Sequence, residues 1–438
     1  MSSLKTRWWV AMELIEKILE YGRTRADEVE VYVSESESVS ADLKKDRVEN
    51  AGGSQAFGIG IRVIDHGRIG VSATSSKGEW RACLDAALAS ARLAHPQEWK
   101  SLPGPAALPD VPAIFDASLS LDPEWCRTAL EGMLHGAEEH DAAVTGGGAS
   151  VGRGKETVAN TSGVLYEQER TSAGCSLECI HEQSTGYEFD ASCFAGEIDP
   201  VRVGREAAFF AEHSADGEEI ETGDYDLVLS PVALSQLLGY VLEPALSGRN
   251  VHAGRSWLAG KLGEVCIGEE ISVYDDPLDG GLSSTRFDAE GIPARKLTFF
   301  DHGELRSYAY DLRTAYRYGA ESTGSAVRGG AGGAPAIGIH TLVIDGPRGT
   351  VDDDRAVYVH DVVGAHTANA LTGDFSVELS NPSWVEDGEF TAPVKGAMYA
   401  GNVFDLLGEV VALGRKERSV GGAVLPAVRL SGQRLIGR

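Results

Sequence analysis

The chain has 438 residues, enough for two or three domains, and an ordinary globular composition with 42% hydrophobic and 24% charged residues. Its 66 acidic residues outnumber its 39 basic ones, and the formal net charge of −27 argues against nucleic acid and anionic membrane as partners. No apolar run approaches the roughly 18 residues of a membrane span. Arginines outnumber lysines by 28 to 11, a bias that fits either a salty cytoplasm or a GC-rich genome.

The N-terminal segment predicts an amphipathic helix over residues 6–22, not a signal peptide. It has no small-residue cleavage site, and Glu13, Glu16 and Lys17 interrupt its apolar region. We therefore expect a cytoplasmic protein. The six cysteines of such a chain are expected to be free thiols, because disulfides are rare in reducing compartments.

The next segments alternate apolar and polar residues, as half-buried strands do, and are separated by Gly and Asp turn signals. These strand-like runs cover residues 29–36, 38–50, 55–67 and 68–76. A helix is predicted over 79–94, so the order helix–strands–helix indicates helices layered on an antiparallel sheet. Residues 96–113 contain five prolines and are expected to form an extended linker.

A second α+β segment follows the linker. A helix is predicted over 122–140, starting at Asp122-Pro123, then alternating strands over 156–197 and a helix over 199–214. After residue 222 the sequence is rich in glycine and strand-like runs, with one helix predicted at 232–246. The fold class is therefore α+β: an N-terminal antiparallel sheet layered with helices, then a large β-rich C-terminal domain. The expected parts are 1–113 (N-terminal domain and linker), 114–221 (central segment) and 222–438 (C-terminal domain).

A glycine-rich stretch at 146–156, GGGASVGRGKE, superficially resembles a phosphate-binding loop. That loop needs Gly six positions before its Lys and Ser or Thr after it, and here Ala149 and Glu156 take those places. A strand rather than a helix is predicted to follow, so no helix N-terminus would face a phosphate. ATP binding is not expected.

A zinc site is suggested by a cluster of potential ligands, Cys175, Cys179, His181 and Cys193. In an extended strand, however, Cys-x3-Cys spans about 13 Å, too far for both sulfurs to bind one ion at about 2.3 Å. We expect small side chains buried in a sheet. The histidines are scattered and no HExxH occurs, although a Ser-His-Asp triad remains open.

Four segments taken together resemble the TldD/PmbA family of modified-peptide metalloproteases. Their order and spacing are more specific than any one of them, and the resemblance covers nearly the whole chain. The segments are 48–63 (VENAGGSQAFGIGIRV), 274–296 (YDDPLDGGLSSTRFDAEGIPARK), 303–324 (GELRSYAYDLRTAYRYGAESTG) and 371–403 (LTGDFSVELSNPSWVEDGEFTAPVKGAMYAGNV).

The family has two kinds of subunit, and the resemblance places this chain with the PmbA or TldE kind. The TldD kind carries a metal helix, Leu-His-Glu-Ala-x-Gly-His-x-Leu-Glu, after a strand. This chain has LSQLLGYVLE at 234–243 in the same frame. Ser235, Gln236 and Tyr240 replace the two His and the Glu, and they are poor zinc ligands beside His and carboxylate. Catalytic members also use a C-terminal cysteine, whereas this chain has none after Cys266.

The resemblance implies a subunit without catalytic or metal-binding residues, with zinc expected only in a TldD-like partner. The heteromer would degrade or process small unfolded or modified peptides, and this chain would shape the substrate channel. Arg313 and Arg328 could equally be structural ion-pair partners. The candidates to line the cleft are Glu243, Arg313, Ser322, Thr323, Arg328, Asp374 and Asn402.

Two other functions remain open from the sequence. The chain could be a homodimeric peptide-binding or scaffolding protein without protease activity. It could also be a metal-free hydrolase that uses Ser235 or Ser322, although neither has a neighbouring histidine in sequence.

Overall fold

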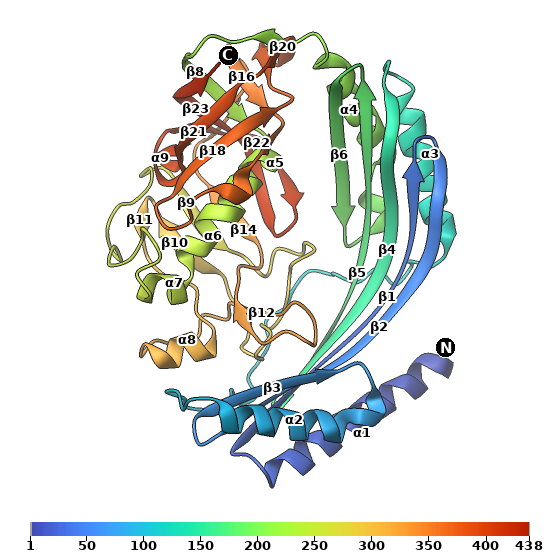
Figure 1. Cartoon of the computed structure of the whole chain (residues 1–438), viewed down its shortest axis with the longest axis vertical. Coiled ribbons are helices and arrows are strands. Elements are labelled where there is room, and N and C mark those ends of the chain that lie inside the picture. Colours follow the sequence, from blue (N-terminus) through green and yellow to red (C-terminus); the bar gives the residue numbers. More distant parts are fainter. Residues whose placement is uncertain (1, 438) are drawn as a thin grey trace.

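The computed structural model describes residues 2–437, with side chains described from residue 12 onward. Figure 1 shows a long curved sheet, built from the first half of the chain, beside a compact β-rich body built from the second half. Helices lie along one face of the long sheet, and the β-rich body lies on the side of the other face. None of the helices in the described residues is long and apolar enough to cross a lipid bilayer.

The long sheet is antiparallel throughout, in the order β3-β2-β1-β4-β5-β6. Strands of the predicted first and second parts therefore share one sheet. Its strands are β1 (Glu28–Lys44), β2 (Arg47–Asp65), β3 (Arg68–Thr74), β4 (Ala143–Asn160), β5 (Leu165–His181) and β6 (Ser184–Ser192).

The predicted boundaries of the first strands are wrong. The runs 29–36 and 38–44 form one strand, β1, and the hairpin turns at Lys45 and Asp46, inside the second predicted run. Lys45 adopts a positive φ of 58° there. The strands are long because β1 pairs with β2 on one side and with β4 on the other, and these pairings outweigh the local turn signals.

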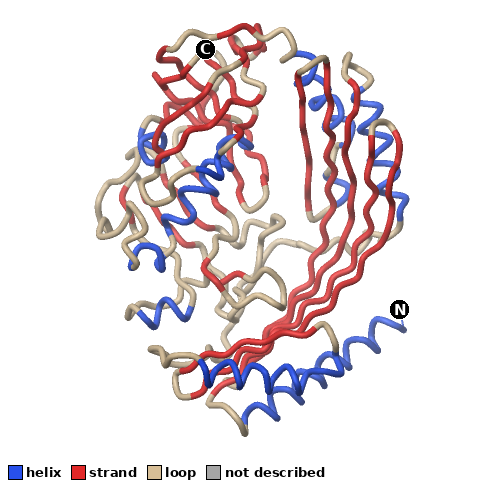
Figure 2. The backbone as a smooth tube through the Cα atoms, viewed as in Figure 1, coloured by secondary structure: helices blue, strands red, loops and turns tan. Residues whose placement is uncertain are grey.

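Two helix pairs cover opposite ends of one face of this sheet (Figures 1 and 2). Val29, Val31 and Val33 of β1 pack with α1 (Ser2–Arg23) and α2 (Trp80–Leu93), whereas Ala41 and Leu43 pack under α3 (Pro123–Ala137) and α4 (Pro200–His213). All these strand residues share one face because strand side chains alternate. The four predicted helices are thus confirmed.

Local capping and close packing explain where these helices sit. Asp122 caps α3 by accepting a hydrogen bond from the Glu124 amide, with Pro123 at the first helical position. At the crossing of α3 and α4, a Cβ on Gly204 would lie 1.9 Å from the Met133 carbonyl oxygen, so only glycine fits.

The two rejected motifs lie inside this sheet. Residues 146–156 belong to β4, so the glycine-rich stretch is strand and not a phosphate loop. Cys175 and Cys179 lie on β5 in the apolar core beneath α3 and α4, as expected for small buried side chains.

The C-terminal body contains, within residues 2–437, a fifteen-stranded mixed sheet and a small two-stranded sheet, β12 (Ala326–Val327) with β13 (Ala336–Ile337). The fifteen strands are β7 (Glu218–Glu219), β8 (Gly223–Leu229), β9 (Ser272–Asp275), β10 (Leu297–Asp301), β11 (Glu304–Leu305), β14 (Leu342–Asp345), β15 (Arg348–Gly349), β16 (Ala356–Val359), β17 (Asp361–Val363), β18 (Asp374–Ser380), β19 (Ser383–Glu386), β20 (Glu389–Lys395), β21 (Met398–Asn402), β22 (Val410–Val420) and β23 (Ala423–Ile436).

The predicted helix at 232–246 is confirmed, with an unexpected widening in its middle. It comprises α5 (Pro231–Leu237), a π-helical turn (Leu238–Leu242) and α6 (Glu243–Leu246), and Ser230 caps its start. The Glu243 amide donates to the Leu238 carbonyl, five residues back. Such π turns occur most often at functional positions. The remaining helices are α7 (Gly248–His252), α8 (Leu312–Arg317) and α9 (Val403–Gly408).

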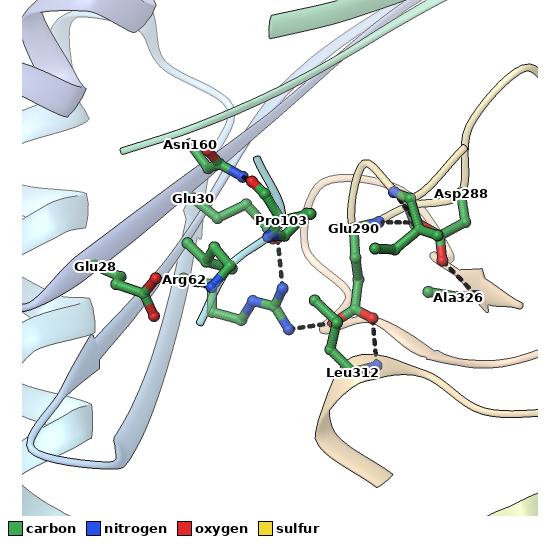
Figure 3. Close-up of polar contacts among 12 residues, drawn as sticks. Glu28, Glu30, Arg62, Pro103, Asn160, Asp288, Glu290, Leu312 and Ala326 are labelled. Atoms are coloured by element: carbon green, nitrogen blue, oxygen red, sulfur yellow. Dashed lines mark hydrogen bonds and ion pairs between the residues drawn. The ribbon is translucent and has the colours of Figure 1, made fainter. Parts of the chain in front are cut away.

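A buried ion network joins the long sheet to the C-terminal body (Figure 3). Arg62 of β2 donates to Glu30 of β1 and to Glu290 of the C-terminal body, both at 2.5 Å. Arg328, also from the C-terminal body, pairs with the other oxygen of Glu30. Every one of these side chains is at most 4% exposed. Two arginines thus link residues that are far apart in the sequence.

Burial raises the pKa of two acids in this region, Glu290 and its neighbour Asp288. Burial raises the pKa of Glu290 to about 7, opposed by the charge of Arg62 and assisted by Asp288. Burial likewise raises the pKa of Asp288 to about 6, although three backbone amides donate to it. The second oxygen of Glu290 accepts from the Leu312 amide at 2.7 Å, at the start of α8. The network therefore also fixes α8.

The linker at residues 95–116 has no helix or strand, as predicted, and passes through this junction. Asn160 of β4 donates to the Pro103 carbonyl oxygen at 2.9 Å, and Trp99 donates to Glu28 of β1 at 2.6 Å. Tyr316 of α8 donates to the Ser101 carbonyl oxygen at 2.7 Å. The linker is thus a strut between the sheet and the C-terminal body.

Replacing Arg62 with Met should lower the free energy of unfolding by about 3–5 kcal/mol, because it leaves Glu30 and Glu290 without the guanidinium that bridges them. Arg62→Lys should restore only part of the loss, since an ammonium lacks the planar fork that reaches both acids. Guanidinium denaturation measures both effects. Arg127→Met, which breaks an exposed helical ion pair, is the control, and an equal effect of both Met variants would contradict the role of the network.

Candidate functional site

The helix at 231–246 presents three polar side chains, each of which is engaged locally or exposed. Ser235 Oγ donates to the Val232 carbonyl oxygen of its own helix at 2.8 Å. Gln236 Nε2 donates to Asp361 Oδ1 of β17 at 3.2 Å. Tyr240 is 49% exposed, and its ring centroid lies 6.3 Å from that of His366. The leucines on the other side of this helix are fully buried in the core.

These donors do not fit a catalytic zinc site. A hydroxyl already bonded to its own backbone, a side-chain amide and a phenol are weak zinc ligands, and the carboxylate of Asp361 contacts only the amide of Gln236 among them. Within the described part of the chain, the residues that come together with metal-ligand spacing are Asp27, Asp65 and His66. They flank β1 and β2 in the N-terminal sheet, and none of them is near this helix.

Neither candidate serine has the geometry of an activated nucleophile. Such a serine needs a base that accepts its proton, but Ser235 and Ser322 each donate to a backbone carbonyl oxygen, that of Val232 and that of Tyr310, respectively. Thr323 accepts from the Tyr310 amide at 2.8 Å and is buried. Ser322 and Thr323 therefore hold the segment around Tyr310 in place.

Glu243, at the end of the π turn, is a half-buried acid next to a second one. Burial raises the pKa of Glu243 to about 7, and the charge of Asp275 adds to this effect. Asp275 is itself buried and accepts from the Thr341 amide at 2.8 Å. The Glu243 carboxyl therefore binds a proton more tightly than an ordinary glutamate does.

Asp374 and Asn402 pair with each other on neighbouring strands, β18 and β21. Asn402 Nδ2 donates to Asp374 Oδ1 at 2.9 Å, and Asn402 Oδ1 accepts from the Phe404 amide at the start of α9. The hydroxyl of Thr372 and then the amide of Asn402 lower the pKa of Asp374. Asp374 is exposed to solvent. Asn402 caps the start of α9 through its side-chain oxygen.

Arg313 and Arg328, indistinguishable in the sequence, lie in different surroundings. The Arg328 side chain is 3% exposed and pairs with Glu30. Arg328 is therefore a structural ion-pair partner, the second of the two roles considered for it. Arg313, on α8, is exposed and donates through Nε to Gln97 of the linker at 2.7 Å. It lines a pocket of about 740 Å³ between the sheet and the C-terminal body. The seven cleft candidates thus fall in four places: the helix, the segment around Tyr310, the β18–β21 pair and the junction.

The functional residues that sequence reasoning missed are at the junction. Glu30 and Arg62 are ionisable residues inside strand runs that are otherwise apolar, VEVYV and GIGIRVI. A charged residue at a buried strand position usually has a partner of opposite charge, so the signal was present. Glu290 had no such signal, because it lies in a polar segment.

The inner face of the long sheet is lined with small side chains. Tyr32 of β1 packs against Phe287 and Ala331 of the C-terminal body, so every second residue of β1 from Tyr32 onward faces that body. From Ser34 to Ser40, these residues and their partners on β2 and β4 are small except for one acid: Ser34, Ser36, Ser38, Ser40, Gly52, Ser54, Ala56, Gly58, Ser150, Gly152, Gly154 and Glu156. Backbone is therefore accessible across the middle of this face.

Between the two helix pairs, the outer face of the sheet carries charged side chains. Glu35 and Glu37 of β1 lie there and pair with Lys77 at 3.1 Å and with Arg153 at 2.7 Å. They line a pocket of about 870 Å³ with Phe57 on its wall. Because its charges are already paired, this pocket offers no free charge to a ligand.

Glu243→Gln tests the protonated acid at the base of the helix. The folded chain keeps this proton up to about pH 7, whereas an ordinary glutamate releases it near 4.5. The stabilisation is therefore complete below about pH 4.5 and is lost as the pH rises through 7. Thermal midpoints between pH 5 and 8.5 should fall for the wild type relative to Glu243→Gln. Exposed Glu269→Gln should follow the wild type, and parallel curves for all three proteins would contradict the raised pKa.

Comparison with known proteins agrees with this architecture. Family models match three parts of the chain: PmbA/TldA metallopeptidase domain 1 matches residues 29–91, the central domain matches 116–215, and the C-terminal domain matches 222–437. An uncharacterized protein of Methanocaldococcus jannaschii is 32% identical over 425 residues, covering 96% of this chain and 99% of that one. Metalloprotease PmbA of Escherichia coli O157:H7 is 25% identical over 457 residues, with 99% and 98% covered.

A solved structure has the same fold over its full length. TldE from Thermococcus kodakarensis superposes with a TM-score of 0.89 at 26% identity, covering 97% of this chain and 100% of that one. The three domain matches together span most of the chain. It belongs to the PmbA/TldD metallopeptidase family.

Proposed function

We propose that this chain is a non-catalytic, PmbA/TldE-like subunit of a cytoplasmic TldD/PmbA-type protease. It would form a heteromer with a metal-bearing TldD-like subunit and shape the channel through which small unfolded or modified peptides reach that subunit. The observation that carries the proposal is the helix at 231–246. It keeps a buried leucine frame while presenting Ser235, Gln236 and Tyr240, none of which can activate a water molecule.

Amide hydrolysis at neutral pH needs an activated water or nucleophile. Ser235 donates to its own helix backbone, and Gln236 has no proton-accepting base in its amide group. Zinc is therefore expected in the partner subunit, where a complete ligand set would stand on the equivalent helix.

The inner face of the long sheet supports a role in holding peptides. Its serines and glycines leave the strand backbone open to approach, and an extended peptide can be held through backbone contacts with little selection of side chains. This suits substrates that share an unfolded backbone but no sequence.

The surroundings of the helix favour a protein partner. Tyr240, Val363 and Leu371 are 49%, 59% and 46% exposed, and they lie on the helix, at the end of β17 and in the segment that follows β17, respectively. Exposed apolar side chains near one site often mark a protein interface. A TldD-like subunit would cover them in the heteromer.

The purified chain should retain no stoichiometric zinc, because the side chains at positions 235, 236 and 240 are poor ligands. Elemental analysis after metal-free dialysis measures this, and a chelator should leave the thermal midpoint unchanged, unlike in proteins folded around structural zinc. One tightly bound zinc per chain would contradict the proposal.

The chain should cleave an unstructured peptide only when mixed with a TldD-like partner, and a chelator should block the mixture. The assay compares this chain, the partner and both together. Cleavage by the partner alone at the rate of the mixture would exclude a contribution of this chain. Binding without cleavage in every sample would instead favour the homodimeric peptide-binding function.

Two variants of this chain serve as controls for the assay. Ser235→Ala should leave the activity of the mixture unchanged, since the Ser235 hydroxyl only supports its own helix. Chelator-resistant cleavage by the isolated chain that Ser235→Ala abolishes would establish the serine mechanism instead. The triple variant Ser235→His, Gln236→Glu and Tyr240→His should remain inactive alone, because the chain has no cysteine after Cys266.

A further inference from the structure

The pocket at the junction combines one cationic wall with one apolar wall. Its cationic side carries Arg313 and Arg317 of α8, one helical turn apart, and the apolar side carries Ile69 and Val71 of β3. Val71 is 42% exposed. The other residues that line the pocket are Arg62, Ala94, His95, Pro96, Gln97, Glu98, Ala334 and Pro335.

The arginines of α8 are exceptional in a chain with a net charge of −27. Among the described residues, no carboxylate forms an ion pair with Arg313 or Arg317, and the one hydrogen bond of the Arg313 guanidinium goes from Nε to the neutral side chain of Gln97. The planar ends of both guanidinium groups therefore remain able to bind an anion. Glu98 is the acid of the pocket lining, and it is exposed to solvent.

A third arginine, Arg62, also lines this pocket. Arg62 is nearly fully buried and uses its two terminal nitrogens for Glu290 and Glu30. Its Nε–H has no acceptor within the described part of the chain. A buried donor without an acceptor is costly and uncommon, and this one belongs to a residue that lines the pocket.

The apolar wall is also a free sheet edge. β3 ends the strand order of the long sheet, and it pairs only with β2 among the described strands. Gly70 packs against α2, where a Cβ would lie 2.1 Å from the Ala87 carbonyl oxygen. Because strand side chains alternate, Ile69 and Val71 face the other way, into the pocket. An extended segment can add to such an edge through its backbone.

We propose that this pocket binds the C-terminal end of a peptide. The terminal carboxylate would be held by Arg313 and Arg317, the last side chain would lie on Ile69 and Val71, and the preceding backbone would pair with β3. Arginine suits this role because its planar fork matches a carboxylate. The proposal rests on the proposed peptide-handling function, to which it adds recognition of the free carboxyl end.

The test is calorimetric binding of three probes to the full chain. The first is an N-acetylated, unstructured eight-residue peptide ending in Ala-Leu with a free carboxylate, the second is the same peptide as its C-terminal amide, and the third is N-acetyl-leucine. We expect the acid to bind about ten- to a hundredfold more tightly than the amide, as for a charge-assisted hydrogen bond. N-acetyl-leucine, which cannot pair along β3, should bind much more weakly than the acid peptide.

Matched double variants locate the effect. Arg313→Gln with Arg317→Gln should abolish the preference for the acid. Arg47→Gln with Arg415→Gln, which removes the same charge at exposed positions outside the pocket, should preserve it. All four side chains are exposed, so both variants should fold, and thermal midpoints verify this.

Several results would overturn the proposal: equal binding of acid and amide, no binding of either, a preference that survives loss of both α8 arginines, or N-acetyl-leucine that binds as tightly as the acid peptide. Its failure is distinguishable from that of the proposed function. Cleavage by the mixed subunits without a preference for the acid peptide would contradict only the proposed pocket. A preference for the acid peptide without cleavage would contradict only the proposed protease function.

Discussion

Arg62 lies between Glu30 of the long sheet and Glu290 of the C-terminal body, and most of the arrangement of the molecule depends on this buried bridge. Three charges taken out of water are tolerated only when each is paired. A different placement of the long sheet relative to the C-terminal body would leave at least one of these charges unpaired. Arg328 adds a second cation to Glu30 from the C-terminal side. The network therefore favours one placement of the long sheet relative to the C-terminal body.

The same bridge determines the geometry of the junction pocket. Glu290 accepts from the amide of Leu312, and Asp311 caps the same helix by accepting from Thr314. These two acids fix where α8 starts, and with it the positions of Arg313 and Arg317. Charges that are buried for structural reasons thus hold two exposed arginines against the edge of the sheet. A functional surface placed by a rigid buried network is well suited to recognition, because its side chains need little further ordering.

The long sheet separates structural from exposed chemistry by its two faces. Valines and alanines on the outer face are covered by two helix pairs, and paired charges fill the gap between these pairs. The inner face carries serine and glycine where it faces the C-terminal body. A sheet buried on both faces would be apolar on both. The small, polar inner face suits the proposed contact with peptides, and the buried leucines of the helix at 231–246 hold that helix in the core.

Sequence patterns were sufficient to predict the family, the α+β class and the five main helices. The helices were predictable because an amphipathic repeat and a cap such as Asp122 or Ser230 act within a few residues. The replacement of metal ligands at Ser235, Gln236 and Tyr240 stays a prediction from the family resemblance, because it depends on side-chain chemistry at the spacing of the family motif.

The strand boundaries, the π turn and the roles of the arginines could not be predicted from the sequence, because they depend on contacts between distant segments. The hairpin turn at Lys45 and Asp46 follows from pairing of β1 with strands on both sides, one of them more than a hundred residues away in the sequence. Arg328 and Arg313 look alike in the sequence, but Arg328 finds Glu30 at a separation of 298 residues, whereas Arg313 remains exposed at the junction pocket. Local propensity carries no information about such distant partners, and the free energy of pairing a buried charge is what distinguishes them.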